Sequence, residues 1–183
     1  MSVQKKFGGE LTDEEFRKFT LYTTQSGNFE DDNTRANILG FVNDKVRIAP
    51  GAVVRINDNQ IGVNSYVGLY SYVNGDVEIG ENVLIGPHSS IVASNHVFSP
   101  VDDCFSDRSD LSKGKVVIEV GVWLAAGVVI TPGVNVGKCS LICANSVVTN
   151  NIKPYSIAAG TPAKVIGRID QNTGEYSWFN KDK

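Results

Sequence analysis

The chain has two histidines, His88 and His96, and histidine is the side chain best suited to carry protons at neutral pH. His96 lies in the segment SNHVFSPVDD, where Asp102 and Asp103 follow closely. A positioned imidazole can act as a general base, so His96 is a candidate catalytic residue. His88 lies in GPHSS, where a solvated surface side chain is the simpler interpretation. From spacing alone, a catalytic role and a surface role both stay open for His96.

The elements that must position these histidines follow a period of six residues. This period fits neither an α-helix nor the alternation of a strand, and it is typical of a parallel β-helix. Three hexapeptides make one coil with three faces, and stacked coils bury one aliphatic residue from each hexapeptide. Fifteen hexapeptides predict about five coils. The aliphatic positions, with one extra residue after the third, are Val42, Ile48, Val54, Ile61, Val67, Val73, Ile79, Ile85, Ile91, Ile118, Leu124, Ile130, Val136, Ile142 and Val148.

The repeat divides the chain into three parts. Residues 1–40 form an N-terminal cap or flap, residues 41–153 form the β-helix, and residues 154–183 form an extended C-terminal cap and tail. Within the β-helix, residues 97–115 carry no hexapeptide phase, so a loop leaves the coils there. A long loop that interrupts a rigid solenoid is often functional.

The N-terminal part contains one helix signal and one loop signal. Thr12 and Glu15 have the spacing of a capping box, which predicts a short helix with Phe16 and Phe19 on one side. We expect this helix to cover the open end of the β-helix. Residues 23–37 are polar and turn-rich, which predicts a loop or a flap beside the substrate.

Composition indicates one mildly acidic, soluble domain. The chain has 183 residues, a net charge of −3 and 42% hydrophobic residues. This balance favours neither nucleic acid nor an anionic membrane as a partner, and no run approaches the length of a membrane span. Cys104, Cys139 and Cys143 lack metal-binding spacing, which favours reduced thiols and a cytoplasmic location.

Three segments and the repeat together carry a family resemblance: IGENVLIGPHSSIVASNH (79–96), VVIEVGVWLAAGVVITPGVNVG (116–137) and IKPYSIAAGTPAKVIGRI (152–169). Over about residues 42–169 the chain resembles the hexapeptide-repeat acyltransferases. Within them it is similar to the maltose/galactoside O-acetyltransferase branch, a relative of the xenobiotic acetyltransferases. The resemblance implies an all-β, single-stranded left-handed parallel β-helix and a homotrimer with its sites between neighbouring prisms. It also implies acetyl-CoA as co-substrate, without a metal.

The resemblance also implies residue roles. The loop histidine matches His96, which would take a proton from the acceptor hydroxyl as that hydroxyl attacks the thioester. It would then protonate the departing CoA thiolate. A backbone N–H around Ala126 would stabilise the oxyanion. The acceptor-binding candidates are Asn95, His88 and Asp102. The CoA-binding candidates are Trp123, Ala125, Ala126, Gly127, Thr131, Ala144, Thr161, Lys164 and Arg168.

Some of these positions have simpler interpretations, and some depart from the family pattern. Trp123 can equally cover an interface between protomers, and Lys164 can be a solvated cap residue. The family often has a Lys-Asp pair where this chain has Asn150–Asn151, and Gly167 intervenes before Arg168. One expected cation for the CoA phosphates is therefore missing.

The predicted function is O-acetyl transfer from acetyl-CoA to a saccharide or sugar-derived hydroxyl. One alternative is a sugar-nucleotide N-acetyltransferase of the same fold, whose amine acceptor need not require histidine as base. Another is a non-catalytic β-helix scaffold. A γ-type carbonic anhydrase needs three histidines on zinc, and the chain has two.

Overall fold

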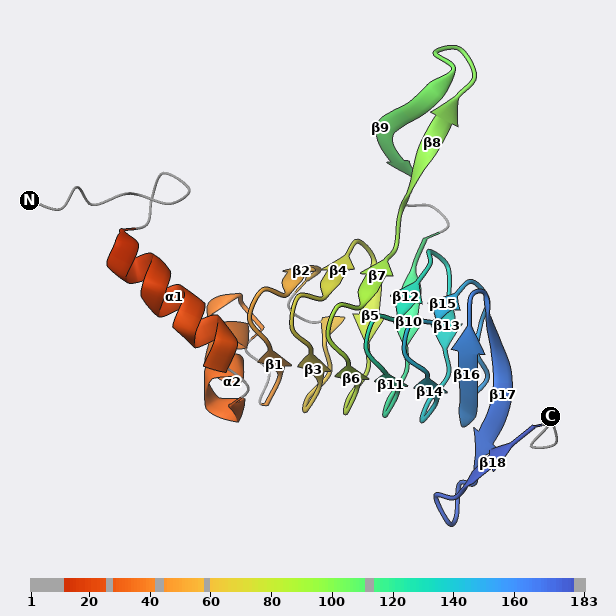
Figure 1. The fold of residues 1–183 in the computed structure, drawn as a ribbon. Helices are drawn as coiled ribbons and strands as arrows, with labels where there is room; N and C mark the ends of the chain where they lie inside the picture. Colours follow the sequence, from red (N-terminus) through yellow and green to blue (C-terminus); the bar gives the residue numbers. More distant parts are fainter. Residues whose placement is uncertain (1–11, 26–27, 42–44, 58–59, 111–113, 180–183) are drawn as a thin grey trace, which may run out of the picture.

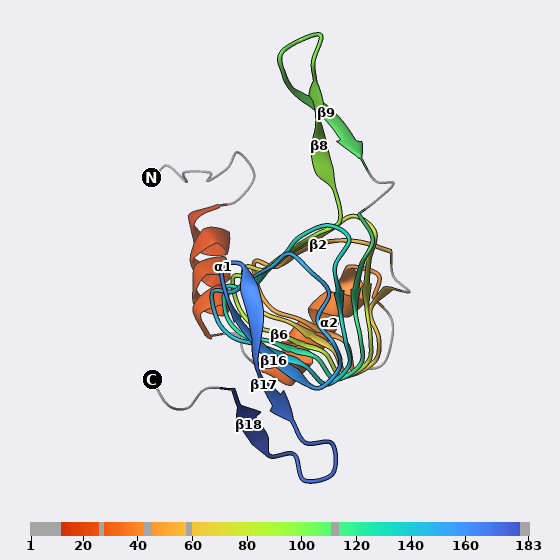
Figure 2. The same ribbon diagram turned by 90° about the vertical axis from the view of Figure 1, so that its right-hand side faces the viewer.

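The computed structural model describes residues 12–25, 28–41, 45–57, 60–110 and 114–179. These residues form a triangular prism of stacked parallel coils, with helices at one end and an antiparallel extension at the other (Figures 1 and 2). A hairpin projects from one edge. The predicted single-stranded left-handed parallel β-helix is confirmed. Neither helix in the described part of the chain is long and apolar enough to cross a bilayer.

Three sheets form the walls of the prism, and the chain visits them in turn. Wall 1 contains the parallel strands β1 (Arg47–Ile48), β3 (Tyr66–Val67), β6 (Leu84–Ile85), β11 (Trp123–Leu124), β14 (Leu141–Ile142) and β16 (Ser156–Gly160). Wall 2 contains β2 (Val53–Arg55), β4 (Tyr72–Asn74), β7 (Ser90–Val92), β12 (Val129–Ile130) and β15 (Val147–Val148). Wall 3 contains β5 (Val77–Ile79), β10 (Val116–Ile118) and β13 (Asn135–Val136). The six parallel strands of wall 1 correspond to about six turns, against about five expected from the hexapeptides.

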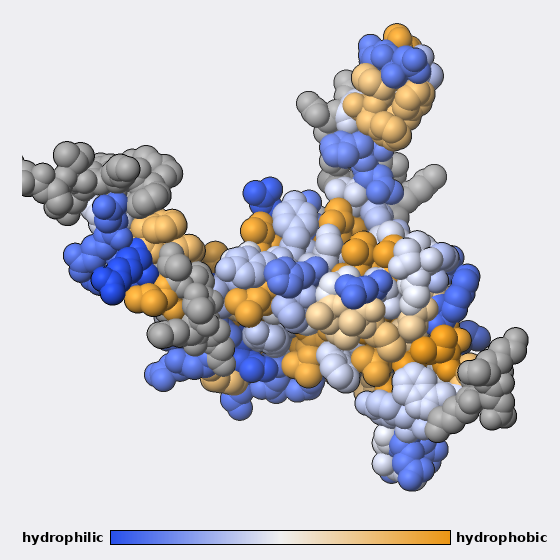
Figure 3. Space-filling view, in the orientation of Figure 1, coloured by the Kyte–Doolittle hydropathy of each residue, from blue (hydrophilic) through white to orange (hydrophobic). Residues whose placement is uncertain are grey.

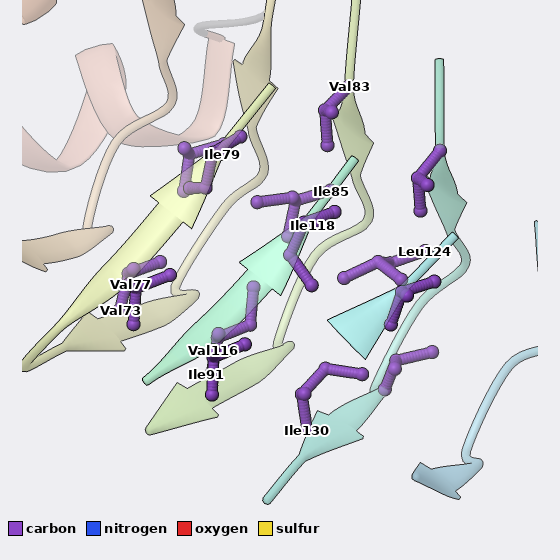
Figure 4. Packing of buried hydrophobic residues seen from close by; sticks show 14 of the residues in the cluster. Val73, Val77, Ile79, Val83, Ile85, Ile91, Val116, Ile118, Leu124 and Ile130 are labelled. Atoms are coloured by element: carbon purple, nitrogen blue, oxygen red, sulfur yellow. The ribbon is translucent and has the colours of Figure 1, made fainter. Parts of the chain in front are cut away.

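The hexapeptide aliphatic residues form the core, as the repeat predicts. Thirteen of the fifteen are at most 2% exposed, and Figure 4 shows part of this column between the walls. Val54 is half-buried against the core, and Val42 lies outside the described residues. Full burial of an aliphatic side chain contributes about 1.5–3 kcal/mol, so the column is a main source of stability.

Buried serines at the corners join successive coils. Ser65 is 1% exposed, and its Oγ donates to Gly80 O at 2.8 Å while accepting from Val83 N–H at 3.0 Å. Ser140 makes the corresponding pair of bonds nearer the C-terminal end. A small hydroxyl therefore satisfies backbone groups that turn away from the strand ladders at a corner.

The first helix, α1 (Asp13–Gln25), begins with the predicted capping box. Glu15 N–H donates to Thr12 Oγ1 at 3.3 Å, and the Glu15 carboxylate accepts from Thr12 N–H at 2.7 Å. The expectation that this helix covers the open end of the prism is wrong. Phe16 and Phe19 are 40% and 55% exposed, and α1 points away from the coils (Figure 1).

The second helix, α2 (Phe29–Ile38), occupies most of the segment for which a loop or flap was expected, so the loop prediction is wrong for those residues. The helix forms because Asn28 accepts a hydrogen bond from Asp31 N–H at 2.9 Å and acidic residues fill its first turn. It also closes the end of the prism. Ala36 is fully buried in the core, and buried Asp32 pairs with Arg35 at 2.9 Å.

The segment predicted as a loop is a β-hairpin of β8 (Asn95–Ser99) and β9 (Cys104–Asp110). It leaves the prism at the corner between wall 2 and wall 3, which we call the hairpin edge. The coils resume after it without a change of register, because β10 pairs directly with β5, Val116 opposite Val77.

The C-terminal segment is extended, as predicted. β17 (Ala163–Ile169) pairs antiparallel with β16, and β18 (Tyr176–Trp178) pairs antiparallel with β17. The direction of pairing therefore reverses at the end of wall 1.

Candidate active site

His96 lies on β8 at the root of the hairpin, and its side chain is exposed. Nδ1 of its ring is 3.0 Å from the backbone carbonyl oxygen of Ser106 on β9. A carbonyl oxygen only accepts hydrogen bonds, so in the neutral imidazole the proton belongs on Nδ1. Nε2 then carries a free lone pair, which is the arrangement that a general base needs.

The two acceptor-binding candidates on the hairpin, Asn95 and Asp102, lie at its opposite ends. Asn95 is exposed beside His96, at the root. Asp102 lies in the turn, where its carboxylate accepts a hydrogen bond from Ser99 Oγ at 2.7 Å. The structure therefore places Asn95 near the candidate base and Asp102 nearer to the tip. A cavity of about 370 Å³ lies along the hairpin, lined by Val97, Ser99, Asp102 and Ser106.

The corner between wall 1 and wall 2 forms a second edge, which we call the Ala126 edge. His88 lies on it, exposed, and its ring stacks on Tyr70 with the centroids 5.6 Å apart. His88 and His96 therefore flank β7 at its two ends rather than sharing one site in a single chain. Residues with positive φ occupy this edge in successive coils: Gly51, Tyr70, His88, Gly127 and Asn145.

The backbone of Ala125–Gly127 offers one unpaired N–H group on the Ala126 edge. The N–H groups of Ala125 and Gly127 donate to neighbouring coils, each at 2.9 Å. The N–H of Ala126 between them has no acceptor within the described ranges, and Ala126 is exposed. Ala144 occupies the same position one coil further, and its N–H also lacks an acceptor in the described part of the chain. Two free donors in adjacent coils can pair with the carbonyl groups of an extended ligand.

The remaining CoA-binding candidates lie in three places. Thr161 reaches the Ala126 edge, where its hydroxyl is 3.4 Å from a carbonyl oxygen of Asn145. Trp123 is 46% exposed on wall 1, and Lys164 and Arg168 are exposed on β17, which extends the same wall. Thr131 is apart from them, because it follows β12 at the hairpin edge.

Wall 2 separates His96 from the Ala126 edge within one chain. The chain passes along each strand of wall 2 from the Ala126 edge to the hairpin edge, so the two edges bound opposite sides of that wall (Figure 2). The candidate base and the free N–H groups are therefore at different corners of the triangle. A site that uses both groups needs the hairpin of one copy beside the Ala126 edge of another.

The three cysteines are free thiols. Cys104 is exposed on the hairpin, whereas burial raises the pKa of the half-buried Cys143 thiol and lowers its reactivity. In the part of the chain that the structure describes, no three His, Cys, Asp or Glu side chains are grouped so that they could hold a metal ion.

Ser106 contacts the candidate base but is not among the residues predicted from the sequence. The hexapeptide phase is absent from 97–115, so that pattern gives no information about the segment. A different signal exists there, since the similar segments VFS (97–99) and CFS (104–106), which contain strand-favouring residues, flank the turn-forming residues PVDD. Such a pattern is typical of a hairpin and would bring Ser106 close to His96.

No family model matches the chain. A galactoside O-acetyltransferase from Lactococcus lactis subsp. lactis (strain IL1403) is 36% identical over 130 residues, which cover 67% of this chain and 60% of that protein. The chain thus spans about three fifths of the length of the curated relatives it matches.

Solved structures agree with this relationship. A maltose O-acetyltransferase from Clostridium difficile 630 superposes with a TM-score of 0.58 at 25% identity and covers 86% of each chain. A hexapeptide-repeat acetyltransferase from Vibrio cholerae O1 biovar eltor, complexed with acetyl coenzyme A, has a TM-score of 0.57 at 22% identity. It covers 92% of this chain and 95% of that chain, and it shows the shared fold. The chain is therefore related to the galactoside and maltose O-acetyltransferases and is built on the hexapeptide-repeat β-helix.

Proposed function

We propose that the protein is an acetyl-CoA-dependent O-acetyltransferase that acts on a hydroxyl group of a saccharide or sugar derivative. The observation that carries this proposal is the His96 ring, whose Nδ1 faces the Ser106 carbonyl so that Nε2 is left free on an exposed hairpin. The relationship to galactoside and maltose O-acetyltransferases supports both the reaction and the class of acceptor.

In the proposed reaction, Nε2 of His96 removes the proton of the acceptor hydroxyl while the hydroxyl oxygen attacks the thioester carbonyl carbon. The Ala126 N–H of a neighbouring copy donates to the oxyanion of the tetrahedral intermediate. Collapse of the intermediate breaks the C–S bond, and the imidazolium gives its proton to the CoA thiolate. The acetyl ester and CoA leave, and His96 is neutral again.

CoA is assigned to the Ala126 edge. The thioester carbonyl faces the free N–H of Ala126, a carbonyl group of the pantetheine arm pairs with the free N–H of Ala144, and the arm passes Trp123. The nucleotide end reaches Thr161 and the cations of β17, Lys164 and Arg168. Thr131, at the hairpin edge, is left out of this path.

The acceptor is assigned to the space between the two edges. Asn95 and Asp102 contact it from the hairpin of one copy, and His88 contacts it from the Ala126 edge of the neighbour. All three acceptor candidates can contact one acceptor in this arrangement, because one copy provides Asn95 and Asp102 and its neighbour provides His88.

A homotrimer with three such sites is part of the proposal. The separation of His96 from the Ala126 edge within one chain supports it, and so does the apolar surface of the hairpin (Figure 3). Val101 and Phe105 are 91% and 72% exposed, and a neighbouring copy would cover them. The free thiols and the need for acetyl-CoA support a cytoplasmic location.

The test is an acetyl-CoA consumption screen over sugars, nucleotide sugars and hydroxyl-bearing antibiotics, with thiol release as the readout. With the best acceptor, His96→Ala is expected to lower kcat by about 10²–10⁴-fold, because the general base is lost. Thermal unfolding of the variant checks that the fold is kept, which is expected because His96 is exposed outside the core.

Three outcomes would contradict the proposal in different ways. A His96→Ala variant with normal kcat on a hydroxyl acceptor would remove His96 as base. Efficient turnover of amine acceptors alone would assign N-acetylation instead. An absence of both CoA release and CoA-induced thermal stabilisation would indicate a non-catalytic scaffold, since a ligand at 100 times its Kd adds about 2.7 kcal/mol of stability.

A further inference from the structure

We propose that Ser106 is a positioning residue for His96 and determines which nitrogen of the ring carries the proton. The inference deepens the O-acetyl transfer proposed above and rests on it for its activity readout. Its spectroscopic readout is independent of any reaction.

The register of the hairpin changes beside His96. His96 pairs with Ser109, whereas Phe98 pairs with Phe105. Between these two pairs, β8 has one residue and β9 has three. Such bulges bend a strand and change the direction of its groups, and they are frequent beside active sites.

Ser106 is one of the extra residues of β9, and it spans the bulge with two contacts to consecutive residues of β8. Its carbonyl oxygen is 3.0 Å from Nδ1 of His96. Its Oγ donates to the carbonyl oxygen of Val97 at 3.1 Å. The second contact holds the Ser106 backbone where its carbonyl reaches the ring, so the hydroxyl acts on His96 through the backbone.

The protonation pattern of the base follows from these contacts. A proton on Nε2 would set the Nδ1 lone pair against the lone pairs of the Ser106 carbonyl, and the hydrogen bond would be lost. With the proton on Nδ1, Nε2 is free to accept the proton of a hydroxyl. A neutral carbonyl thereby fills the role that a carboxylate fills in many catalytic histidine pairs.

The first measurement is the ¹⁵N NMR spectrum of the wild-type protein at about pH 8.5, where an ordinary imidazole is neutral. We expect His96 to carry its proton on Nδ1. The chain has only two histidines, so the spectrum of a His88→Asn variant assigns the His96 signals. An Nε2–H form of His96 in the wild-type protein would overturn the inference, and this result needs no Ser106 variant.

The second measurement compares Ser106→Ala with the wild type. Loss of the hydroxyl is expected to convert the His96 signals to a tautomer mixture and to lower kcat by about ten-fold or more, with KM for acetyl-CoA unchanged. Ser106→Thr keeps a hydroxyl and is expected to restore both readouts. A Ser106→Ala variant with wild-type tautomer and kcat would refute the role of the side chain.

Ser65→Ala is the matched control. Ser65 Oγ also joins two segments, through Gly80 O at 2.8 Å, but it does so in the body of the prism. We expect this variant to melt at a lower temperature with the His96 tautomer and kcat unchanged. A tautomer change in Ser65→Ala would mean that general destabilisation moves the ring, and the inference would fall. An active His96→Ala variant would refute the proposed base while the NMR result still tests Ser106.

Discussion

Corner residues on the Ala126 edge use their backbone N–H groups in a fixed way. In Gly86–His88, the first and third residues donate to neighbouring coils and the middle one, Pro87, has no N–H to donate. Pro50 occupies the same position two coils earlier. Positive φ at the third residue completes the pattern expected of a type II turn. Ala126 therefore stands where proline is structurally acceptable, and its N–H is available to a ligand.

Because Ala126 occupies the same corner position as Pro87, its backbone N–H can be removed by a proline substitution with little effect on the fold. Ala126→Pro is expected to fold normally, because Pro87 N lies over Gly68 just as Ala126 N lies over Gly86. If the Ala126 N–H stabilises the oxyanion, kcat should fall by about 10²–10³-fold. The measurements are steady-state kinetics and thermal unfolding.

Glu81→Pro is the control for this variant. Glu81 is the middle residue of a corner between wall 3 and wall 1, and its neighbours Gly80 and Asn82 donate in the same way. We expect normal kcat for Glu81→Pro. Equal losses in both variants would assign the effect to the corner geometry and not to a lost oxyanion donor.

At the scale of elements, the hairpin is an insertion that the coils tolerate without adjustment. Ile79, Ile118 and Val136 stack in register across the insertion point. Most side chains of residues 95–106, the part of the hairpin whose exposure is described, are exposed, so this part buries little of its own surface in one chain. Removal of the hairpin should abolish acetyl transfer and change the stability of the chain only slightly.

Replacing residues 96–109 by Asn-Gly tests this separation. The new turn would join Asn95 to Asp110, which already face each other across the hairpin. We expect the melting temperature of the unassembled chain to change by less than about 4 °C, which corresponds to about 1 kcal/mol for a chain of this size. Acetyl transfer should be lost. Non-cooperative unfolding would show instead that the hairpin is part of the folding unit.

The sequence predicts the elements that repeat, the start of α1 and the extended C-terminal segment, but α2 and the hairpin were not predicted from it. Ile118 and its counterparts were located because a six-residue period demands one buried residue in each hexapeptide. α2 was missed because its polar composition is typical of loops, while its stability depends on the Asn28 cap and on Ala36 packing against the first coil. The hexapeptide period does not reach Ser106. The hairpin signal around residues 97–106 places Ser106 near His96, but the bulge that sets the exact contact follows no sequence pattern.

At the scale of the whole molecule, the proposed site is shared between copies, and subunit mixing tests this directly. His96→Ala and Ala126→Pro chains are each expected to be inactive as homotrimers. In randomly mixed trimers, about one quarter of the sites would pair an intact His96 with an intact Ala126, so about one quarter of the wild-type activity should return. Light scattering should give a mass of three times 19.8 kDa for the wild type.

Mixed trimers are made by unfolding and refolding the two variants together. As a control, each variant is unfolded and refolded alone, and it should remain inactive. Mixed trimers, verified with two affinity tags, that show no recovery would place both groups of a site in the same chain. That result would contradict the shared site, whatever the activity of the wild-type enzyme.

The reversal of direction at β17 has a consequence for the length of the assembly. A parallel sheet that ends in an open strand offers a template to any chain with the same repeat, and such templates lead to fibres. On wall 1, β17 fills this position with a strand of opposite direction, and α2 lies across the other end of the prism. Both ends of the prism are therefore covered, which disfavours end-to-end stacking of copies into filaments. Side-by-side association of copies through the walls and edges is not affected.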